Sequence, residues 1–216
     1  MCRLFGMHGG RRTVSATFWL LDAPSSLAAQ SATQPDGYGI GTFEEDGSPD
    51  VDKGAVRAAE DELFACEAQQ ERSRTFVAHL RFASTGVPAM ENTHPFEQHG
   101  RLFAHNGVLW GLPELEERLG EHRSLVHGDT DSERLFALIT RETELRGGDV
   151  ESGIRAAIGW VADHVPVFSL NFVLTTPPTC GRCAIPRRTT CSSASAPPAA
   201  RTSTAPPARC TCGRPS

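Results

Sequence analysis

The stretch RLFAHNGVL, residues 101–109, predicts a β-strand. Its high density of apolar residues is typical of a strand in a sheet that is covered by other elements on one or both faces. Its Asn-Gly pair at 106–107 is a turn signal, so we expect the strand to end there. The stretch TFVAHLRFA (75–83) has the same crowded pattern and predicts another strand. Together they indicate a sheet with at least one buried face.

Downstream of this strand the apolar residues follow the period of a helix. GDTDSERLFALITRETE (128–144) begins with Asp, Thr and Ser, which are common helix caps. Its apolar residues at helical spacing are Leu135, Leu138 and Ile139. ESGIRAAIGWVADHV (151–165) predicts a second amphipathic helix, and VFSLNFVLTT (167–176) predicts a strand. Strands and helices mix along the chain, so the expected fold class is α+β.

Composition excludes several classes of protein. The chain has 216 residues, 39% of them hydrophobic, which is enough for one sizeable core. It has no run of about 18 apolar residues, so we expect no membrane span. It does not open with a basic segment followed by a long apolar one, so we expect no export signal and a cytoplasmic protein.

The charge is divided unevenly. The total is −5, but residues 177–216 contain six Arg and no acid, so the remainder carries −11 once those six positive charges are removed. Such an acidic body argues against nucleic-acid binding.

Residues 176–216 differ from residues 1–175, which look like one globular domain. The tail is rich in Pro, Ala, Arg and Cys, and after Ile185 it contains no large apolar residue. Such a segment cannot bury enough apolar surface to offset the entropy of ordering it, which favours disorder. Zinc binding through CGRC (180–183) and CTC (210–212) is disfavoured for the same reason.

A frameshift is the other interpretation of the tail. Residues 178–186 permit codons that, read in a shifted frame, encode Asp-Leu-Trp-Ala-Leu-Arg-Tyr-Pro, which has the pattern of a strand. We expect a shifted frame rather than a genuine disordered tail.

Cys2 is the first candidate for chemistry. If the initiator Met is removed, the Cys2 thiol lies beside its own free α-amine, whose pKa of about 7.7–8.0 suits a general base at neutral pH. Taken alone, Cys2 is more simply a small buried apolar residue.

Three further motifs favour catalysis. Arg81 follows a predicted strand and could clamp a carboxylate, and Asp131 begins a predicted helix and could hold an ammonium group. The Asn106 amide beside the Gly107 backbone N–H suits an oxyanion hole. With a Cys2 nucleophile, these groups match an α-amino acid with a scissile side-chain carbonyl, such as glutamine or a γ-glutamyl amide.

The motifs also carry a family resemblance. After Cys2 the chain contains, in order, DGYGIG (36–41), HLRFASTG (79–86), ENTHPF (91–96), HNG (105–107) and GDTDSE (128–133). Over residues 2–175 this series resembles the class-II glutamine amidotransferases, which are N-terminal-nucleophile hydrolases. The resemblance implies a four-layer αββα sandwich of two mainly antiparallel sheets. Here the fold would lack its C-terminal strands, because the tail stands where family chains continue.

The resemblance also implies the site residues. The nucleophile would be Cys2, and the substrate α-carboxylate and α-amine would bind Arg81 and Asp131. The other members are the oxyanion-hole pair, Asn106 and Gly107, and an additional substrate contact, Ser84. We expect no cofactor and no metal.

Some family features concern structure or partners. Gly37 and Gly39 would keep a turn near the site open. Phe82 and Thr85 stand where members that feed a synthase have Trp and His. The chain therefore resembles the short stand-alone branch that includes the γ-glutamyl hydrolase of ergothioneine biosynthesis. A separate synthase subunit that receives ammonia stays open as a partner. As an alternative function, the chain would be a truncated, catalytically impaired homologue or a binding module without turnover.

Two groups of residues receive structural interpretations. His79, His94, His99 and His105 lie close in sequence, and we expect structural, hydrogen-bonded histidines rather than a metal site. AAEDELFACEAQQER (58–72) predicts a solvated helix with Cys66 in the core.

Overall fold

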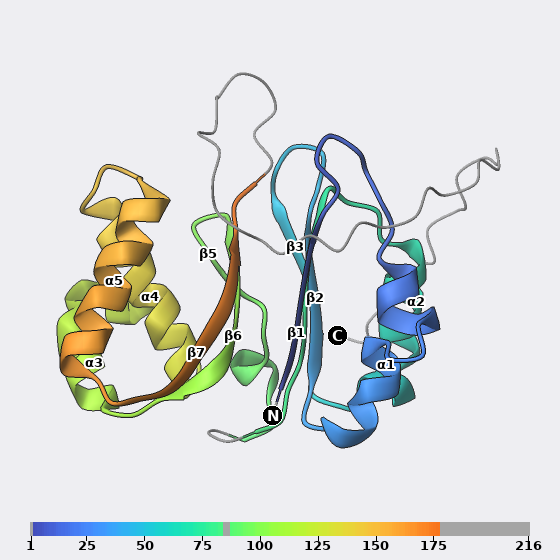
Figure 1. Ribbon diagram of the computed structural model, residues 1–216, viewed down its shortest axis with the longest axis horizontal. Coiled ribbons are helices and arrows are strands. Elements are labelled where there is room, and N and C mark those ends of the chain that lie inside the picture. The colour runs from blue at the N-terminus through green and yellow to red at the C-terminus, as the bar shows by residue number, and fades with distance from the viewer. Residues whose placement is uncertain (1, 84–86, 178–216) are drawn as a thin grey trace. The chain divides into compact units, whose positions relative to one another are not determined.

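Two antiparallel sheets form the centre of the computed structural model, which describes residues 2–83 and 87–177 (Figure 1). The first sheet has the order β1-β4-β2-β3. Its strands are β1 (Arg3–His8), β2 (Tyr38–Phe43), β3 (Pro49–Gly54) and β4 (Thr75–Leu80). The second sheet has the order β5-β6-β7. Its strands are β5 (Phe96–Gln98), β6 (Arg101–Leu109) and β7 (Val167–Thr175).

Helices cover the outer face of each sheet. Figure 1 shows α1 (Leu27–Gln30) and α2 (Glu62–Gln70) against the first sheet. The second sheet is covered by α3 (Leu112–Leu119), α4 (Asp131–Glu144) and α5 (Val150–His164). The two sheets face each other between these helical layers. This αββα arrangement confirms the predicted fold class.

Three groups of buried apolar side chains hold the four layers together. The group between the sheets contains Phe43, Val77, Leu102 and Ala104. The group under α1 and α2 includes Ile40, Phe64, Phe76 and Leu80, and the group under α3, α4 and α5 includes Phe103, Leu115, Leu135 and Phe136. Alternation along β6 explains this division, because successive strand residues point to opposite faces of a sheet.

The predicted turn at Asn106-Gly107 is wrong. β6 continues through both residues to Leu109, with Asn106 paired to Asn171 and Gly107 to Leu170 on β7. The pair lies inside a strand because β7 supplies a long antiparallel partner, which outweighs the local turn preference. β4 ends earlier than predicted, at Leu80, so residues 81–83 follow the strand as a loop.

The predicted helices are confirmed, with shifted boundaries. α4 begins at Asp131, after the N-cap Thr130, whose side chain accepts a hydrogen bond from the Glu133 N–H at 3.2 Å. Residues 128–130 are therefore a loop. In the predicted helix of residues 58–72, only Glu62–Gln70 is α-helical, and Cys66 is half-buried rather than in the core.

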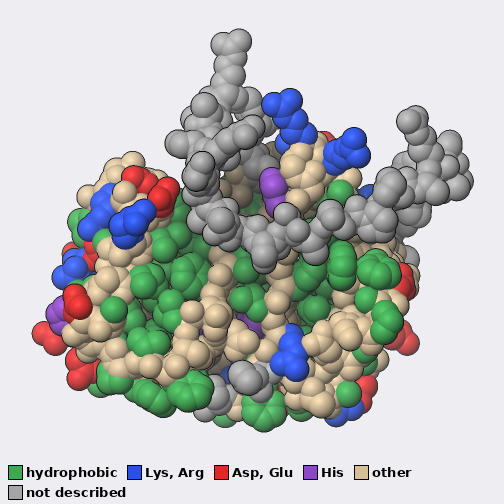
Figure 2. Space-filling view, viewed as in Figure 1, with side chains coloured by type: hydrophobic (Ala, Val, Ile, Leu, Met, Phe, Trp, Pro, Cys, Tyr) green, Lys and Arg blue, Asp and Glu red, His purple; other side chains and the backbone are tan. Residues whose placement is uncertain are grey.

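β7 forms an edge of the second sheet within the described residues. Its apolar residues Leu170, Phe172 and Leu174 pack against the helical side of the sheet but are only partly buried. Figure 2 shows hydrophobic side chains gathered on the face where β7 lies.

The predictions for the tail concern residues 178–216 almost entirely, and these lie outside the described residues. Within residues 2–83 and 87–177, every helix is too short or too polar to span a membrane.

Candidate active site

Cys2 lies directly before β1 and contacts the loop that follows β4. Its Sγ accepts a hydrogen bond from the Phe82 N–H at 3.2 Å and lies 3.4 Å from the Phe82 carbonyl oxygen. The contact follows from the pairing of β1 with β4, in which Arg3 is opposite Leu80. The pairing therefore places the thiol beside residues 81–82.

Arg81 is buried, and the chain on both sides of it is held in place. Its N–H donates to the Gly37 carbonyl at 2.8 Å, and its own carbonyl accepts from the Asp36 N–H at 3.2 Å. The Asp36 carboxylate accepts the Ala83 N–H at 2.8 Å. Gly37 has a φ of +145°, a backbone conformation that favours glycine. Gly39, which was also predicted in this turn, lies within β2.

Asn106 and Gly107 approach the site from β6. The Asn106 side-chain amide donates to the Cys2 carbonyl at 3.0 Å. Gly107 has no room for a side chain, because a Cβ there would collide with the Ser169 carbonyl and the His105 ring. Glycine is therefore required at 107 for packing, apart from any role in catalysis.

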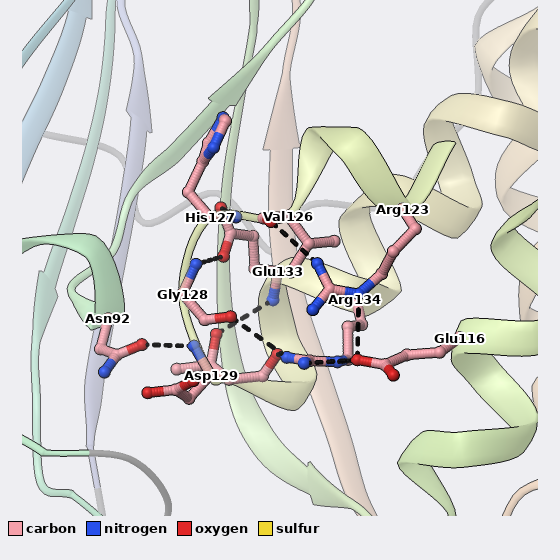
Figure 3. Close-up of polar contacts among 10 residues, drawn as sticks. Asn92, Glu116, Arg123, Val126, His127, Gly128, Asp129, Glu133 and Arg134 are labelled. Atoms are coloured by element: carbon pink, nitrogen blue, oxygen red, sulfur yellow. Dashed lines mark hydrogen bonds and ion pairs between the residues drawn. The ribbon is translucent and has the colours of Figure 1, made fainter. Parts of the chain in front are cut away.

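A network of hydrogen bonds holds the loop before α4 (Figure 3). The Glu133 carboxylate accepts the His127 N–H at 3.1 Å and the Gly128 N–H at 2.7 Å. The Arg134 guanidinium donates to the Thr130 carbonyl at 3.0 Å and pairs with Glu116 at 2.6 Å. Both side chains come from the first turn of α4, so the helix holds the loop that leads into it.

Asn92 connects this loop to the segment after Arg81. Its Oδ1 accepts the Asp129 N–H at 2.8 Å, as Figure 3 shows, and its Nδ2 donates to the Val87 carbonyl at 3.2 Å. The side chain is fully buried. Sequence reasoning did not assign Asn92 a role, although it lies in the quoted stretch ENTHPF.

Asp131 is buried at the start of α4. Its Oδ2 accepts the Leu109 N–H at 2.7 Å, and its Oδ1 is 3.4 Å from the Ser132 hydroxyl. The contact with Leu109 fixes the carboxylate against β6. The weaker contact at Oδ1 leaves capacity for another donor.

One cavity brings most of the predicted residues together. Cys2, Arg81, Gly107 and Asp131 all line it. Asn106 contacts Cys2 but is not among the lining residues, and Ser84 lies outside the described residues. The cavity thus places a thiol, a guanidinium and a carboxylate around one space, which suits a ligand that carries both charges.

Three histidines also line this cavity, and the sequence had not predicted that they meet. They are His79, His94 and His105. His105 Nδ1 is 2.9 Å from the Ser132 hydroxyl, whereas within the described chain neither ring nitrogen of His94 has a hydrogen-bond partner. The predicted hydrogen-bonded histidine is therefore wrong for His94. The available signal was that each histidine stands in one of the quoted motifs.

Burial keeps these imidazoles neutral. It lowers the pKa of His79 to about 3 and holds the pKa of His94 well below its usual value. It also lowers the pKa of His105, although the nearby Asp131 carboxylate opposes the change. In the parts of the chain that are described, no group of three or more His, Cys, Asp or Glu residues could hold a metal ion. His99 lies elsewhere and pairs with Glu144 at 2.7 Å.

Comparison with known proteins identifies the family. The profile of the class-II glutamine amidotransferases matches residues 1–175. The chain belongs to this family. The matched segment ends at the last residue of β7, so the family region includes both sheets and all the described helices.

Two relatives show how much of the chain this similarity covers. An uncharacterized protein of Methanocaldococcus jannaschii is 34% identical over 151 residues, which are 68% of this chain and 40% of that protein. A glutamine–fructose-6-phosphate aminotransferase of Agrobacterium fabrum is 33% identical over 66% of this chain and 22% of its own length. The chain thus spans less than half the length of either relative.

A solved amidotransferase structure supports the fold. The structure is glutamine phosphoribosylpyrophosphate amidotransferase from B. subtilis, with a TM-score of 0.58 and 20% identity. The match covers 80% of this chain and 35% of that one.

Proposed function

We propose that this amidotransferase domain hydrolyses the side-chain amide of glutamine or of a γ-glutamyl compound, with Cys2 as the nucleophile after removal of Met1. The observation that carries the proposal is the common cavity of Cys2, Arg81 and Asp131. A thiol that shares a cavity with one cationic and one anionic side chain suits attack on a zwitterionic amino acid.

The substrate would bind through its two charged groups. The Arg81 guanidinium would hold the α-carboxylate, and Oδ1 of Asp131 would hold the α-ammonium group. Ser84 would add a further contact. With the α-carbon held at both groups, the side-chain carbonyl can be presented to the Cys2 sulfur.

The reaction would proceed through a thioester. The α-amine of Cys2 takes the thiol proton, and the sulfur attacks the δ-carbonyl carbon of glutamine. Asn106 and Gly107 would stabilise the oxyanion. The C–N bond then breaks, the amine passes the proton to the leaving ammonia or amine, and water hydrolyses the γ-glutamyl thioester.

The leaving group separates two versions of the reaction. Release of ammonia would serve an acceptor, on a separate synthase subunit or elsewhere, whereas release of a larger amine would make the protein a γ-glutamyl hydrolase of the stand-alone branch. Phe82 in place of Trp supports the second version. Assay of glutamine against γ-glutamyl amides of increasing size distinguishes them.

Intact mass tests the proposal directly. The purified chain is weighed before and after incubation with diazo-oxo-norleucine, an electrophilic analogue of glutamine. We expect loss of Met1 and one adduct on Cys2, and neither adduct nor hydrolysis in Cys2→Ala. The matched control is Cys66→Ala, which removes the other free cysteine of the described chain and should label normally. A folded chain that keeps Met1, or that gains no adduct, would contradict the proposal and indicate a non-catalytic module.

A further inference from the structure

The backbone carbonyl of Cys2 accepts hydrogen bonds from two side chains. Asn106 Nδ2 lies 3.0 Å from this oxygen, and Nη1 of Arg3 lies 3.3 Å from it. Removal of Met1 would leave Cys2 joined to the rest of the chain only through this carbonyl group. The two donors therefore hold the backbone group that tethers the proposed nucleophile.

A residue of α1 holds the Arg3 side chain in this position. Nε of Arg3 donates to Gln30 Oε1 at 2.6 Å, and Gln30 Nε2 donates to the Ser25 carbonyl at 2.7 Å. Because Gln30 is neutral, its contact orients the guanidinium without cancelling the charge. An arginine side chain is cationic at any physiological pH. The contact with Cys2 therefore places a fixed positive charge beside the start of β1.

This charge lies close to the Cys2 nitrogen, which becomes the α-amine when Met1 is removed. The backbone nitrogen and oxygen of one residue are at most about 3.6 Å apart, so this nitrogen is within about 7 Å of Arg3 Nη1. An ordinary α-amine has a pKa of about 7.7–8.0 and is mostly protonated at pH 7. A protonated amine cannot take the thiol proton. A nearby cation disfavours protonation and so increases the fraction of the amine that can act as a base.

Other titratable and charged groups line the same cavity or lie beside it: Arg81, Asp36, Asp131, His79, His94 and His105. The histidines are neutral near pH 7, because burial lowers the pKa of each. Arg81 and Asp36 have opposite charges and attract each other, so their effects on the amine partly cancel. Asp131 opposes Arg3, but its carboxylate binds the Leu109 N–H rather than Cys2. Arg3 contacts the Cys2 backbone directly and should therefore have the larger effect.

We propose that Arg3 is a positioning residue for the Cys2 nucleophile, holding its carbonyl and keeping its α-amine unprotonated at neutral pH. The inference rests on the proposed function, in which the lone pair of this amine takes the thiol proton and later passes it to the leaving group. Two unit charges about 7 Å apart change a pKa by about 0.4 in water and by about 1.7 at an effective dielectric constant of about 20. Arg3 is half-buried, so the pKa of the amine should fall by about 0.5–1.

Charge variants test this role through the pH profile of the rate of labelling by diazo-oxo-norleucine. Arg3→Gln removes the charge, so the midpoint on the acid side of the profile should rise by about 0.5–1 pH unit. Gln30→Glu sets a carboxylate against Arg3 and should raise the midpoint as well. Arg3→Lys keeps the charge and should leave the midpoint unchanged. A residue that only supported the fold would lower the rate at every pH without moving the midpoint.

The matched control is Arg155→Gln, which removes an equal charge from an exposed position on α5 and should not move the midpoint. Unchanged midpoints in Arg3→Gln and Gln30→Glu, or an equal shift in Arg155→Gln, would overturn the inference. If Arg3→Gln does not fold, Gln30→Glu decides by the same criterion. Failure of the unmodified chain to label at any pH would instead count against the proposed function.

Discussion

The Cys2 sulfur accepts a hydrogen bond from the Phe82 backbone N–H at 3.2 Å, although 80 residues separate the two in sequence. The donor is held in position from both sides, because Gly37 binds the Arg81 N–H and Asp36 binds the Ala83 N–H. Placement of the candidate nucleophile therefore depends on the turn before β2 as well as on β1 and β4.

Asn106→Ala should lower turnover more than it lowers stability. It removes the proposed oxyanion donor, so we expect kcat to fall on the order of 10²–10³-fold. Loss of the hydrogen bond to the Cys2 carbonyl should cost about 1 kcal/mol of unfolding free energy. Steady-state kinetics and urea unfolding measure the two effects. Asn171→Ala, which removes only a donor to the Asn106 carbonyl, is the control, and an equal loss of kcat there would contradict an oxyanion role for Asn106.

Gly107→Ala should destabilise the fold. The added methyl group would collide with the Ser169 carbonyl and the His105 ring, so we expect a loss of about 1–3 kcal/mol in unfolding free energy. Gly159→Ala is a matched control, because Gly159 lies in α5 with open space around it. That change should stabilise by about 0.5–1 kcal/mol, since alanine favours a helix. Equal effects of the two changes on the urea midpoint would contradict this interpretation of Gly107.

Glu133→Gln should weaken substrate binding through the loop before Asp131. Glutamine has about the same shape but loses the charge that accepts the His127 and Gly128 N–H groups. The displaced loop should raise KM about tenfold and lower kcat less. Glu117→Gln on α3 is the control, because that side chain is exposed. A change in kcat with KM unaltered would show that the loop does not position the substrate.

Stability should fall as the pH is lowered from about 6.5. The folded-state pKa of His79 is about 3, against an ordinary value of 6.5, so the unfolded chain binds more protons between these values. Each such histidine lowers the unfolding free energy by about 1.4 kcal/mol per pH unit in this range. His94 acts in the same direction. Burial lowers its pKa most, and the neighbouring residues lower it further: His79, His105, Lys53 and Arg81.

Glu67 opposes this trend between pH 4.5 and about 7, because its pKa is raised to about 7 by burial and nearby carboxylates. It is partly exposed, so its effect is smaller than that of the buried histidines. Urea unfolding between pH 7.5 and 5 measures the slope. His94→Phe should make the slope shallower and His164→Phe should not, whereas the same slope in all three proteins would contradict the assignment.

The shifted reading frame is a further expectation. β7 is an edge strand in the described chain, with Leu170, Phe172 and Leu174 only partly buried, and a following strand could cover them. We expect the nucleotide sequence to remain open in the shifted frame beyond the codon of residue 177. A chain carrying the shifted residues should unfold at higher urea concentration than the printed chain. An early stop codon in that frame would exclude this explanation.

The sequence by itself determined the features that depend on neighbouring residues. Helical spacing identified the buried face of α4 through Leu135, Leu138 and Ile139, and the Asp, Thr and Ser cap candidates indicated the region where that helix begins. The alternation of strands and helices indicated the fold class, and the order of the motifs indicated the family.

Only the tertiary structure decided the features that depend on distant segments. Asn106 and Gly107 lie in a strand because they pair with β7, although their local preference is a turn. Asn92 acquired a role only because two loops meet at its side chain. The three histidines share a cavity because two sheets and a loop converge there, and no local pattern records such a convergence. Packing between segments far apart in the chain is a property of the folded state, which is why it could not be predicted from neighbouring residues.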